Sequence, residues 1–490
     1  MTRYEHLIDG HVVDPADRLW FPTVNPYTGK TWAGIARGSA ADIDRAVAAA
    51  QTARRGAWGA MTPTARGKLL VRLAELIEEN AEHLATIEVR DNGKLYSEML
   101  GQVKYLAEWY RYYGGLADKV EGSVVPSDKP DMLNFTRHEP MGVIGIITPW
   151  NSPLLLLAWK LAPALAAGNC AVIKPSEHTS ASTLEFALLF GQAGFPPGVV
   201  NVVTGFGHEA GSALVDHPGV AKIAFTGSDQ IGQLIYEQAA RSLKAVTLEL
   251  GGKSPNIVFK DADPEAALIG VVAGIFAAAG QTCIAGSRLL VQRSIHDAFV
   301  ERLVAFTEAI RPGDPMDPAT QIGPIATEPQ FRKIVDYIAI ARDEGARCAT
   351  GGGAGSDSGL NPQTVQPTIF TGVDPAMRIA REEVFGPVLA VIPFEDEEDA
   401  IRIANGVDFG LAAGVWTADI GRAIRMSEQL DAGTVWINTY RAVSYTSPFG
   451  GTKRSGLGFE NGIEAIRTFT KTKSVWLSTH PDRNNPFTLR

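Results

Sequence analysis

Hydrophobic residues recur at helical spacing in the N-terminal part of the chain. Two such runs cover residues 41–55 and 62–92. Thr62 stands where an N-cap is expected and Pro63 at the first helical position, which marks the start of the second run. We therefore expect two surface helices in this region.

Residues 95–115 carry a stripe of aromatic side chains. We interpret this stripe as core packing or subunit contact and assign no chemistry to it. The next segment, residues 120–140, is bounded by glycine and proline residues and predicts two extended segments. These segments can form a hairpin that projects toward a partner subunit.

From residue 141 the pattern changes to continuous apolar runs separated by helical segments. Strands of this kind, alternating with helices of about ten to fifteen residues, predict a doubly wound parallel sheet. Such sheets bind ligands beyond the carboxyl ends of their strands, so the residues that follow each strand are the candidates for chemistry. The strands are expected at residues 143–147, 170–174, 199–203, 220–225 and 245–250.

A second α/β set begins after Gly251-Gly252. The glycine-rich stretch Gly351–Gly359 follows no expected strand and opens no helix, so we interpret it as a flexible surface connection rather than a phosphate loop. The second set is expected to contain helices at residues 264–279, 295–310 and 329–344 and strands at residues 288–292, 388–394 and 411–416.

Composition restricts the class of protein. The 490 residues suffice for two or three domains, and 45% apolar with 20% charged residues is typical of a globular protein. A formal net charge of −9 gives no broad basic surface for nucleic acid. The start of the chain has no apolar signal-peptide core, and the longest uncharged apolar run, residues 266–280, is shorter than a membrane span. We expect a cytoplasmic protein that binds neither nucleic acid nor membrane.

The cysteines indicate a free thiol rather than a disulfide framework or a metal site. Cys170, Cys283 and Cys348 are too few for a framework, and neither they nor the histidines show metal-ligand spacing. A free cysteine is usually packing, but the small neighbours in Gly280-Gln-Thr-Cys-Ile-Ala-Gly286 leave the Cys283 sulfur uncrowded. As a nucleophile it would need a base or a positive potential, because an ordinary thiol is mostly protonated at neutral pH.

Two polar residues at expected strand ends can serve such a thiol. Glu249 lies in the apolar run 245–250, where a carboxylate is costly unless it is paired or functional. Burial would raise its pKa toward the range of a general base. Asn151 follows the first strand of the sheet and is either a turn residue or, beside a nucleophile, an oxyanion donor.

Three segments compete as nucleotide contacts. Gly205-Phe-Gly-His-Glu-Ala210 fits a Gly-x-Gly-x-x-Ala turn, but the acidic residue expected about twenty residues on is not evident. Ser228 is either a phosphate contact or an ordinary helix N-cap. Lys174 and Glu177, after another strand, are either ribose contacts or a solvated charge pair.

Together these segments resemble the aldehyde dehydrogenase superfamily, in its NAD(P)-dependent hydrolytic branch. The resemblance runs from about Asn25 to the C-terminal segment, and motifs that would be weak singly are specific because they occur in the family's order and spacing. The motifs are Pro149-Trp-Asn151, Lys174-Pro-Ser-Glu177, Phe225-Thr-Gly-Ser228, Glu249-Leu-Gly-Gly-Lys-Ser-Pro255, Gly280-Gln-Thr-Cys283, Glu382-Glu-Val-Phe-Gly-Pro387 and Pro448-Phe-Gly-Gly451.

The resemblance implies a role for each residue of a catalytic centre. Cys283 would attack the aldehyde carbon, while the Asn151 amide and the Cys283 backbone N–H would stabilise the oxyanion. Glu249 would activate the water that hydrolyses the resulting thioester. Lys160 and Glu460 match a proton relay to that base, although by local sequence each is equally a surface charge.

NAD is the cofactor that the resemblance implies. Lys174 and Glu177 match adenosine-ribose contacts, and Ser228 matches a pyrophosphate contact. Glu383 and Phe385 match nicotinamide-ribose contacts. Glu177 favours NAD over NADP without excluding NADP. The remaining expected cofactor contacts are Thr148, Trp150, Asn151, Ser176, Phe225, Gly227, Leu250 and Gly251.

The resemblance also divides the chain into domains. Residues 1–119 and 142–251 are expected to form the NAD-binding domain, and residues 252–450 the catalytic domain. Residues 120–141 and 467–490 are expected to be strands of an oligomerisation element. A homodimer or homotetramer would follow.

The sequence leaves the identity of the aldehyde open. The aromatic members of the expected pocket suggest an apolar or ring-bearing aldehyde, and Arg441 either receives a carboxylate or points into solvent. Phe459 and Thr452 stand where the family pattern has an arginine and an aromatic residue. By the resemblance, the pocket is lined by Ser152, Leu155, Leu156, Trp159, Tyr440, Arg441, Tyr445 and Phe449.

Two other functions remain open at this stage. A relative that transfers the acyl group to coenzyme A would lack the general base, whereas Glu249 is present. A non-catalytic protein of the same fold would not need Cys283, Asn151 and Glu249 together.

Overall fold

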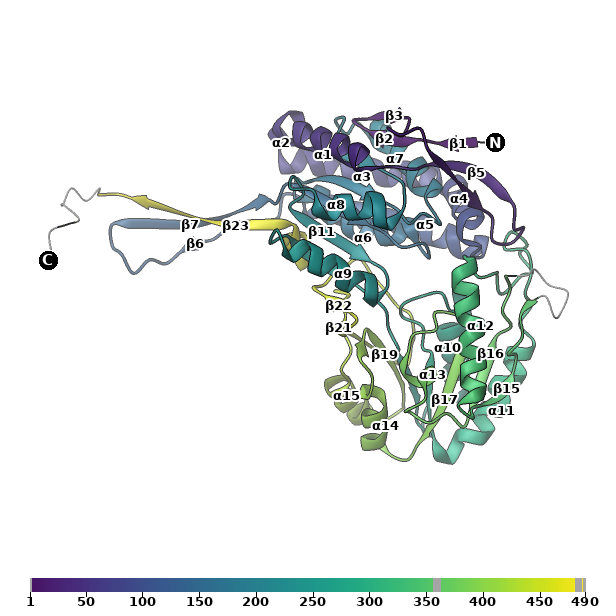
Figure 1. Ribbon diagram of the computed structural model, residues 1–490. Helices are drawn as coiled ribbons and strands as arrows, with labels where there is room; N and C mark the ends of the chain where they lie inside the picture. Colours follow the sequence, from purple (N-terminus) through teal and green to yellow (C-terminus); the bar gives the residue numbers. More distant parts are fainter. Residues whose placement is uncertain (1, 356–362, 481–486, 488–490) are drawn as a thin grey trace.

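The chain folds into two α/β bodies and a narrow β arm. The computed structural model describes residues 2–355, 363–480 and 487. In Figure 1 the N-terminal body stands above the C-terminal body, and the arm projects to one side. The predicted fold class, two doubly wound α/β units with a small β element, is confirmed. Within the described residues no helix is long and apolar enough to cross a membrane.

The first body is built on an eight-stranded sheet in the order β22-β12-β11-β8-β9-β10-β2-β3. Its inner strands run parallel and are mostly buried, which is why they form continuous apolar runs in the sequence. The inner strands are β8 (Val143–Ile147), β9 (Cys170–Lys174), β10 (Val200–Val202), β11 (Lys222–Thr226) and β12 (Ala245–Glu249), and the antiparallel edge strands are β2 (His6–Ile8), β3 (His11–Val13) and β22 (Gly456–Leu457).

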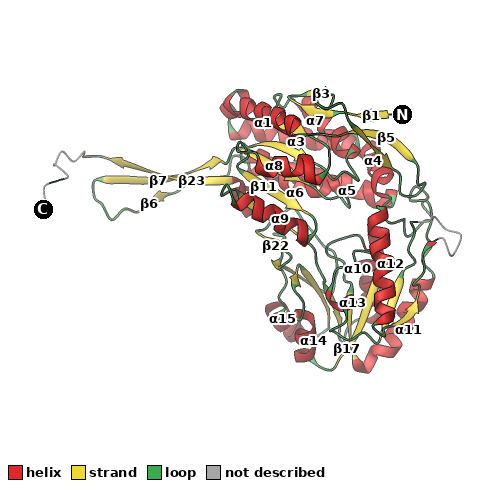
Figure 2. Cartoon of the chain, in the orientation of Figure 1, coloured by secondary structure: helices red, strands yellow, loops and turns green. Residues whose placement is uncertain are grey.

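Helices pack against this sheet; in Figure 2 the helices are red and the strands yellow. α6 (Pro153–Ala166) and α7 (Ala181–Ala193) form one layer, and α8 (Ser212–Asp216) with α9 (Asp229–Ala240) forms another. A π-helical turn, Gly207–Gly211, precedes α8. The N-terminal helices that complete the layers are α1 (Ala40–Arg55), α2 (Ala57–Ala60), α3 (Pro63–Glu79), α4 (Ala81–Asn92) and α5 (Tyr96–Leu116).

The N-terminal region differs from its predicted pattern in two ways. Thr62 is confirmed as an N-cap, since its hydroxyl accepts the N–H of Ala65 (3.3 Å), but the run 62–92 breaks at Asn80 into two helices. Several short strands were missed, because strands of three to six residues give little periodicity to detect. Besides β2 and β3 they are β1 (Thr2–Tyr4), β4 (Trp20–Val24) and β5 (Thr31–Ala36).

The second body is built on a seven-stranded sheet in the order β15-β16-β17-β14-β13-β19-β20, parallel except for β15. Its strands are β13 (Pro255–Val258), β14 (Arg288–Gln292), β15 (Arg347–Thr350), β16 (Thr368–Thr371), β17 (Val388–Phe394), β19 (Ala412–Trp416) and β20 (Thr434–Ile437). Its helices are α10 (Pro264–Phe276), α11 (His296–Glu308), α12 (Glu328–Asp343), α13 (Arg378–Arg381), α14 (Glu397–Asn405) and α15 (Ile420–Gln429).

Two expectations for the second body are corrected. The apolar helix ends at Phe276 rather than at residue 279, because Ala278 and Ala279 adopt left-handed backbone angles. The stretch that begins at Gly351 does follow a strand, β15, which pairs antiparallel with β16. Part of that stretch, residues 356–359, lies outside the described residues.

The arm is a three-stranded antiparallel sheet of β23 (Thr470–Ser478), β7 (Met132–Pro140) and β6 (Val124–Val125). The two extended segments predicted within residues 120–140 are therefore β6 and β7. Its side chains include exposed apolar groups, with Val124 74% and Trp476 54% exposed. Residues 481–486 and 488–490 of the predicted terminal segment lie outside the described residues.

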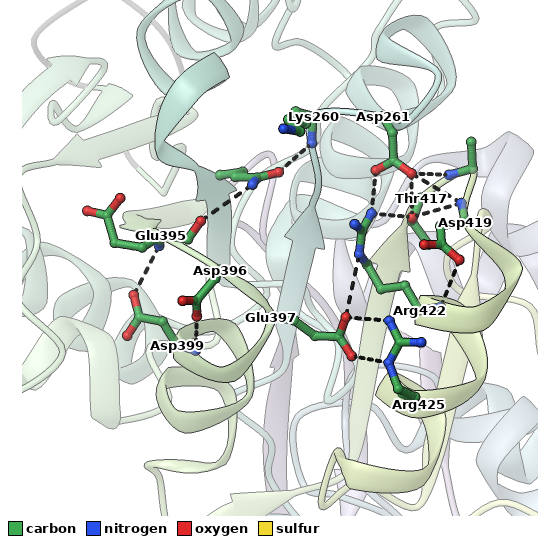
Figure 3. A network of polar contacts seen from close by, with 12 residues as sticks. Lys260, Asp261, Glu395, Asp396, Glu397, Asp399, Thr417, Asp419, Arg422 and Arg425 are labelled. Atoms are coloured by element: carbon green, nitrogen blue, oxygen red, sulfur yellow. Dashed lines mark hydrogen bonds and ion pairs between the residues drawn. The ribbon is translucent and has the colours of Figure 1, made fainter.

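A network of ion pairs and hydrogen bonds connects α14 and α15 on one side of the second body (Figure 3). Arg422 pairs with Asp261 (2.7 Å) and Glu397 (3.7 Å), and Arg425 forms two hydrogen bonds to Glu397 (2.8 Å each). Asp261 also accepts the N–H groups of Ala418 and Asp419 at the start of α15 (3.1 Å each). These charges are mutually paired, so we assign them a structural role. Two short strands, β18 (Phe409–Gly410) and β21 (Thr452–Lys453), pair beside this region.

Candidate active site

Cys283 follows a strained turn at the end of α10. Ala278 (φ 55°), Ala279 (φ 51°) and Gly280 (φ 69°) are consecutive left-handed residues, a conformation that costs non-glycine residues roughly 1–2 kcal/mol each. A Cβ at Gly280 would lie 2.1 Å from the Gly386 carbonyl oxygen, so glycine is required there. Glu98 Oε1 on α5 accepts the Ala278 N–H (3.0 Å) and helps to hold the turn.

The loops after two strands of the first sheet converge on this cysteine. Asn151 Nδ2 donates to the Gln281 carbonyl oxygen (3.0 Å). Gly252 approaches from the loop after β12, where an added Cβ would lie 2.6 Å from the Cys283 carbonyl oxygen. Gln281 is itself fixed, since its Oε1 accepts the Ala326 N–H (2.8 Å). The structure thus brings Asn151 and the Glu249–Gly252 segment to the candidate nucleophile.

A cleft of about 120 Å³ opens beside the Cys283 thiol. It lies between the carboxyl ends of the first sheet and the second body, as expected for a doubly wound domain. Its lining includes Pro149 and Thr226 together with ten of the predicted site residues: Trp150, Asn151, Leu156, Gly227, Ser228, Leu250, Gly251, Cys283, Glu383 and Phe385.

Burial dominates the electrostatics of the thiol and of Glu249. It raises the pKa of the Cys283 thiol to about 12, with the carboxylates of Glu383 and Glu249 adding to the effect. Burial, followed by the negative charge of Glu460, also raises the pKa of Glu249 well above its usual value, while Lys160 lowers it. Within the described residues neither carboxylate oxygen of Glu249 has a hydrogen-bond partner. A buried carboxylate without partners is available to a ligand or a water.

Lys160 and Glu460 form a buried ion pair next to Glu249. Lys160 Nζ lies 2.7 Å from Glu460 Oε1, and the two side chains are 0% and 4% exposed. Lys160 Nζ also donates to Thr226 Oγ1, and Thr226 is the strand partner of Glu249. The reading of these residues as surface charges is therefore wrong. Thr452, one of the two departures from the family pattern, donates to Asp431 (2.7 Å) rather than to this pair.

Lys174 and Glu177 lie at the carboxyl end of β9, apart from the residues that line the Cys283 cleft. Lys174 Nζ pairs with Glu177 Oε2 (2.9 Å), and the pKa of Glu177 is lowered by that lysine in spite of burial. Thr148 joins them through its N–H, which donates to the Lys174 carbonyl (3.2 Å). Ser176, which lies between Lys174 and Glu177 in the sequence, is buried, and its hydroxyl accepts the His178 N–H (3.3 Å).

Ser228 is an N-cap in this structure, because its Oγ accepts the N–H of Ile231 (3.4 Å) at the start of α9. Its side chain nevertheless lines the Cys283 cleft and a second cavity of about 530 Å³, which also shares Lys333 and Glu383. Phe225 lies beneath this turn, where its ring would meet a Cβ at Gly227 at 2.3 Å. Gly205 instead packs against Gly38, where an added Cβ would lie 3.0 Å from the backbone.

Glu383 and Phe385 form the wall of the cleft that belongs to the second body. Glu383 Oε1 accepts the Gly252 N–H (2.9 Å), and a Cβ at Gly251 would lie 2.5 Å from Glu383 Oε2. Phe385 meets Trp150 edge to face, with ring centroids 5.3 Å apart. The two bodies thus contact each other through the predicted cofactor residues.

Besides Pro149 and Thr226, which border predicted residues, sequence reasoning missed Gln330 and Lys333 on α12. Gln330 Nε2 donates to the carbonyls of Val384 (2.8 Å) and Phe385 (3.0 Å) and so fixes the wall. Both are polar positions on an amphipathic helix, and their local pattern is that of a solvent face. Nothing in the local sequence distinguishes them from ordinary surface residues.

The predicted aldehyde pocket contains an aromatic cluster. Trp159 stacks on Trp109 (6.0 Å, 12°) and meets Phe449 edge to face (5.0 Å), while Tyr445 packs on Trp109 (5.6 Å). Leu156 continues this wall into the Cys283 cleft, and Leu155 is half-buried. Most of the aromatic stripe of α5 is core packing, as predicted, and Trp109 packs there against Trp159 and Tyr445 of the predicted pocket.

The other members of the pocket flank the Cys283 loop. The Tyr440 hydroxyl donates to the Ile284 carbonyl (3.1 Å), and its ring fits against Gly274, Gly286 and Gly414. Arg441 has a left-handed backbone (φ 67°), and its Nη1 donates to the Ala273 carbonyl (3.1 Å). Ser152 is buried and accepts a hydrogen bond from Lys94, as described below.

A thiol, a side-chain amide and an unpaired carboxylate beside one cleft can carry out acyl chemistry. The amide can stabilise an oxyanion and the carboxylate can accept a proton. In the described part of the chain no group of three or more histidine, cysteine, aspartate or glutamate residues could hold a metal ion.

The chain is similar to known proteins over almost its whole length. The sequence model of the aldehyde dehydrogenase family matches residues 12–475. An aldehyde dehydrogenase of Aspergillus niger is 48% identical over 469 residues, which is 96% of this chain and 94% of the relative. The (Z)-2-((N-methylformamido)methylene)-5-hydroxybutyrolactone dehydrogenase of Acinetobacter baylyi is 46% identical over 495 residues and 100% of both chains. The solved structure of betaine aldehyde dehydrogenase from Staphylococcus aureus in complex with NAD+ gives a TM-score of 0.97 at 39% identity, over 99% of this chain and 97% of the other.

Proposed function

The chain belongs to the aldehyde dehydrogenase family, and we propose that it oxidises an aldehyde to the carboxylic acid with NAD as the hydride acceptor. The observation that carries this proposal is the convergence of Cys283 and Asn151 on one cleft, with the unpaired carboxylate of Glu249 beside it. A protein that kept only the fold would have no reason to bury an unpaired glutamate there.

The residues present fit a dinucleotide. Gly227 and Gly251 line the cleft with bare backbone, and Ser228, Glu383 and Phe385 line the same cleft with their side chains. We propose that Glu383 and Phe385 hold the nicotinamide ribose and Ser228 the pyrophosphate, with Lys174 and Glu177 on the adenosine ribose. The Glu177 carboxylate would repel a 2′-phosphate, which favours NAD over NADP. When bound, NAD accepts the hydride of the aldehyde.

Cys283 is the proposed nucleophile. Its sulfur forms a bond to the aldehyde carbon, and the carbonyl oxygen takes the negative charge in the stabilising field of the Asn151 amide and the Cys283 N–H. Removal of one such donor typically costs about 10²–10³ in rate. A thiol with a pKa near 12 is almost wholly protonated at neutral pH, so its proton has to pass to a water molecule in the cleft as the bond forms.

Glu249 is the proposed base for the second half of the reaction. After the hydride has left, the acyl group is held as a thioester on Cys283. Glu249 removes a proton from water, the hydroxide adds to the thioester carbon, and the sulfur departs with the proton that Glu249 returns. The carboxylic acid product then loses its proton, which Glu249 and the Lys160–Glu460 pair beside it can pass toward solvent.

The two bodies divide this work in our proposal. The first, residues 1–119 and 142–251, binds the cofactor and supplies Asn151 and Glu249. The second, residues 252–450, supplies Cys283. The arm, with its exposed apolar side chains, joins this chain to further copies in a dimer or tetramer.

Two substitutions test the reaction. Cys283→Ala should abolish NADH formation at 340 nm while NAD binding persists. Glu249→Gln should give a burst of NADH followed by slow turnover, because the thioester forms but is not hydrolysed. Cys348→Ala, a half-buried thiol at the edge of the second sheet, is the matched control and should behave as wild type. Full steady-state turnover in Glu249→Gln would contradict the assignment of the base.

Transfer to coenzyme A is the alternative chemistry. The presence of Glu249 favours hydrolysis, since an acyl-transfer enzyme gains nothing from a base that activates water. NADH formation at 340 nm with a panel of aldehydes, measured with and without coenzyme A, separates the two. NADH formation that depends on coenzyme A would establish the transferase.

A further inference from the structure

Two cationic side chains flank the Cys283 loop outside the reaction described above. Lys94 lies on the turn between α4 and α5, and Arg441 on the loop after β20. Each is linked to the cysteine loop through a neighbouring residue. Lys94 bonds to Ser152, the neighbour of Asn151, and Arg441 follows Tyr440, whose hydroxyl bonds to Ile284.

Lys94 is a buried cation with unused donors. It is 4% exposed, and its Nζ donates to Ser152 Oγ (2.8 Å). An ammonium carries three N–H groups, so this bond leaves two for a ligand. Among the described residues no carboxylate lies within ion-pair distance of Lys94. Burial lowers the pKa of Lys94 to about 8, and the charge of Arg441 contributes, so the two cations act on each other.

Arg441 is held in a conformation that its own residue type does not favour. Its positive φ of 67° is strained for a side chain of this size, and such strain is often found at functional sites. One N–H of its guanidinium reaches the Ala273 carbonyl (3.1 Å). Within the described chain this guanidinium forms no ion pair. Four further N–H groups remain for a planar acceptor such as a carboxylate.

The carboxylates that face these cations do not neutralise both. Glu98 raises the pKa of Lys94 and of Arg441, and its Oε1 also accepts the Ala278 N–H. Glu88 also faces Lys94, and burial raises the pKa of Glu88 to about 7, so it is only partly ionised at neutral pH. The two carboxylates therefore compensate the two cations incompletely, a costly condition for buried charge unless an anion enters.

We propose that the aldehyde this enzyme oxidises carries a carboxylate, which Arg441 and Lys94 bind while the aldehyde carbon meets Cys283. The proposal rests on the proposed dehydrogenase function and names its substrate class. The aromatic cluster of Trp159, Phe449 and Tyr445 packs against the part of the substrate between the two ends. The same two cations repel a quaternary ammonium, the group that the related betaine aldehyde dehydrogenase accepts by its name.

Matched pairs of aldehydes test this directly. Each pair consists of an oxo-carboxylate and its methyl ester, in a series of ω-oxo acids of increasing length and in para-carboxybenzaldehyde. The quantity measured is the ratio of kcat/KM for the acid to kcat/KM for its ester. We expect a ratio of about tenfold or more for at least one pair, since a charge-assisted hydrogen bond is worth a factor of this size. Betaine aldehyde should be a poorer substrate than a neutral aldehyde of similar size.

Variants show whether the two cations produce the ratio. Arg441→Gln should bring the ratio toward one. Lys94→Gln keeps a donor for Ser152 but removes the charge, and it should lower the ratio as well. Arg72→Gln, at an arginine that pairs with Glu75 on the surface of α3, is the control and should leave the ratio unchanged. Equal losses for acid and ester in both pocket variants would mean a structural role and would overturn the proposal, as would a wild-type ratio near one for every pair.

Binding without turnover separates this inference from the proposed reaction. Calorimetry on Cys283→Ala compares para-carboxybenzaldehyde with its methyl ester, which lacks the carboxylate. Tighter binding of the acid, lost in the additional Arg441→Gln variant, supports the anion site even if no aldehyde produces NADH. Equal affinity for the two compounds would overturn it.

Discussion

At the scale of single residues, the protonation state of Glu249 is set by its neighbours. Burial and Glu460 raise its pKa, and Lys160 lowers it. A base is active only when ionised, so hydrolysis of the thioester should fall as pH falls through this raised pKa. The buried pair beside it therefore controls the pH at which the enzyme turns over.

We predict that Lys160→Gln shifts the rise of the kcat–pH profile to higher pH. Removal of the ammonium leaves Glu460 uncompensated and takes away the one group that lowers the pKa of Glu249. Steady-state kcat measured across the neutral range gives the midpoint. Lys471→Gln, an exposed lysine on β23, is the control. A midpoint that stays in place or moves to lower pH would refute the electrostatic role of Lys160.

At the scale of elements, the start of α6 organises the site. Asn151 and Ser152 immediately precede this helix, and Glu88 Oε1 accepts the Leu154 N–H (3.1 Å) in its first turn. A carboxylate at a helix N-terminus is favourable for the helix dipole, but burial raises the pKa of Glu88 to about 7. The cap therefore holds the helix that follows Asn151, the proposed oxyanion donor, at a cost that depends on pH.

The sign of that dependence gives a prediction for Glu88→Gln. The folded-state pKa is raised, so the stability that Glu88 contributes is fully present below its unfolded pKa, near 4.5, and is lost as pH rises through about 7. The glutamine keeps an acceptor for Leu154 and does not ionise. Its free energy of unfolding relative to wild type should thus improve between pH 5 and pH 8, by an amount on the order of 1–3 kcal/mol.

Urea unfolding at both pH values measures this difference. Glu82→Gln, at an exposed position in the first turn of α4, is the control and should show little change with pH. A difference between Glu88→Gln and wild type that is the same at pH 5 and pH 8 would rule out ionisation of Glu88 as its cause.

At the scale of the whole molecule, the arm is the part that has no packing partner of its own. Its strands extend away from both bodies in Figure 1 and expose Val124, Leu133, Trp476 and Leu477. The first body covers its sheet with two layers of helices, whereas the single-layer arm has no layer over either face of its sheet. Association with further copies would cover these side chains.

We predict that Trp476→Glu lowers the molecular mass in solution. A carboxylate in place of a 54% exposed indole would be buried unpaired in an interface. Light scattering coupled to size-exclusion chromatography gives the mass, and circular dichroism checks that the chain stays folded. Lys471→Glu, an exposed charge on the same strand, is the control. A mass equal to wild type in Trp476→Glu would exclude this face of the arm from the interface.

The local sequence correctly predicted those structural features that depend on a single segment of the chain. The apolar runs of β8, β9 and β12 predicted buried parallel strands, and with them the positions of Asn151, Lys174 and Glu249 at strand ends. It failed where distant contacts override local preference. Ala277 to Ala279 continue a helical pattern, yet Glu98 and the backbone of Gly386 hold this segment in a left-handed turn.

By itself, then, the sequence determined the fold class and the identity of the groups that can react, because both depend on patterns within one strand, helix or motif. Only the tertiary structure decided which charges meet. Lys160 and Glu460 are far apart in the sequence, yet they form an ion pair. Gln330 lines the cleft from a helix whose sequence pattern is that of a solvent-exposed face. Lys94 and Arg441 come to the same side of the Cys283 loop close enough for their charges to interact, for the same reason. The distance between two side chains is set by how whole elements pack, and no local pattern encodes that distance.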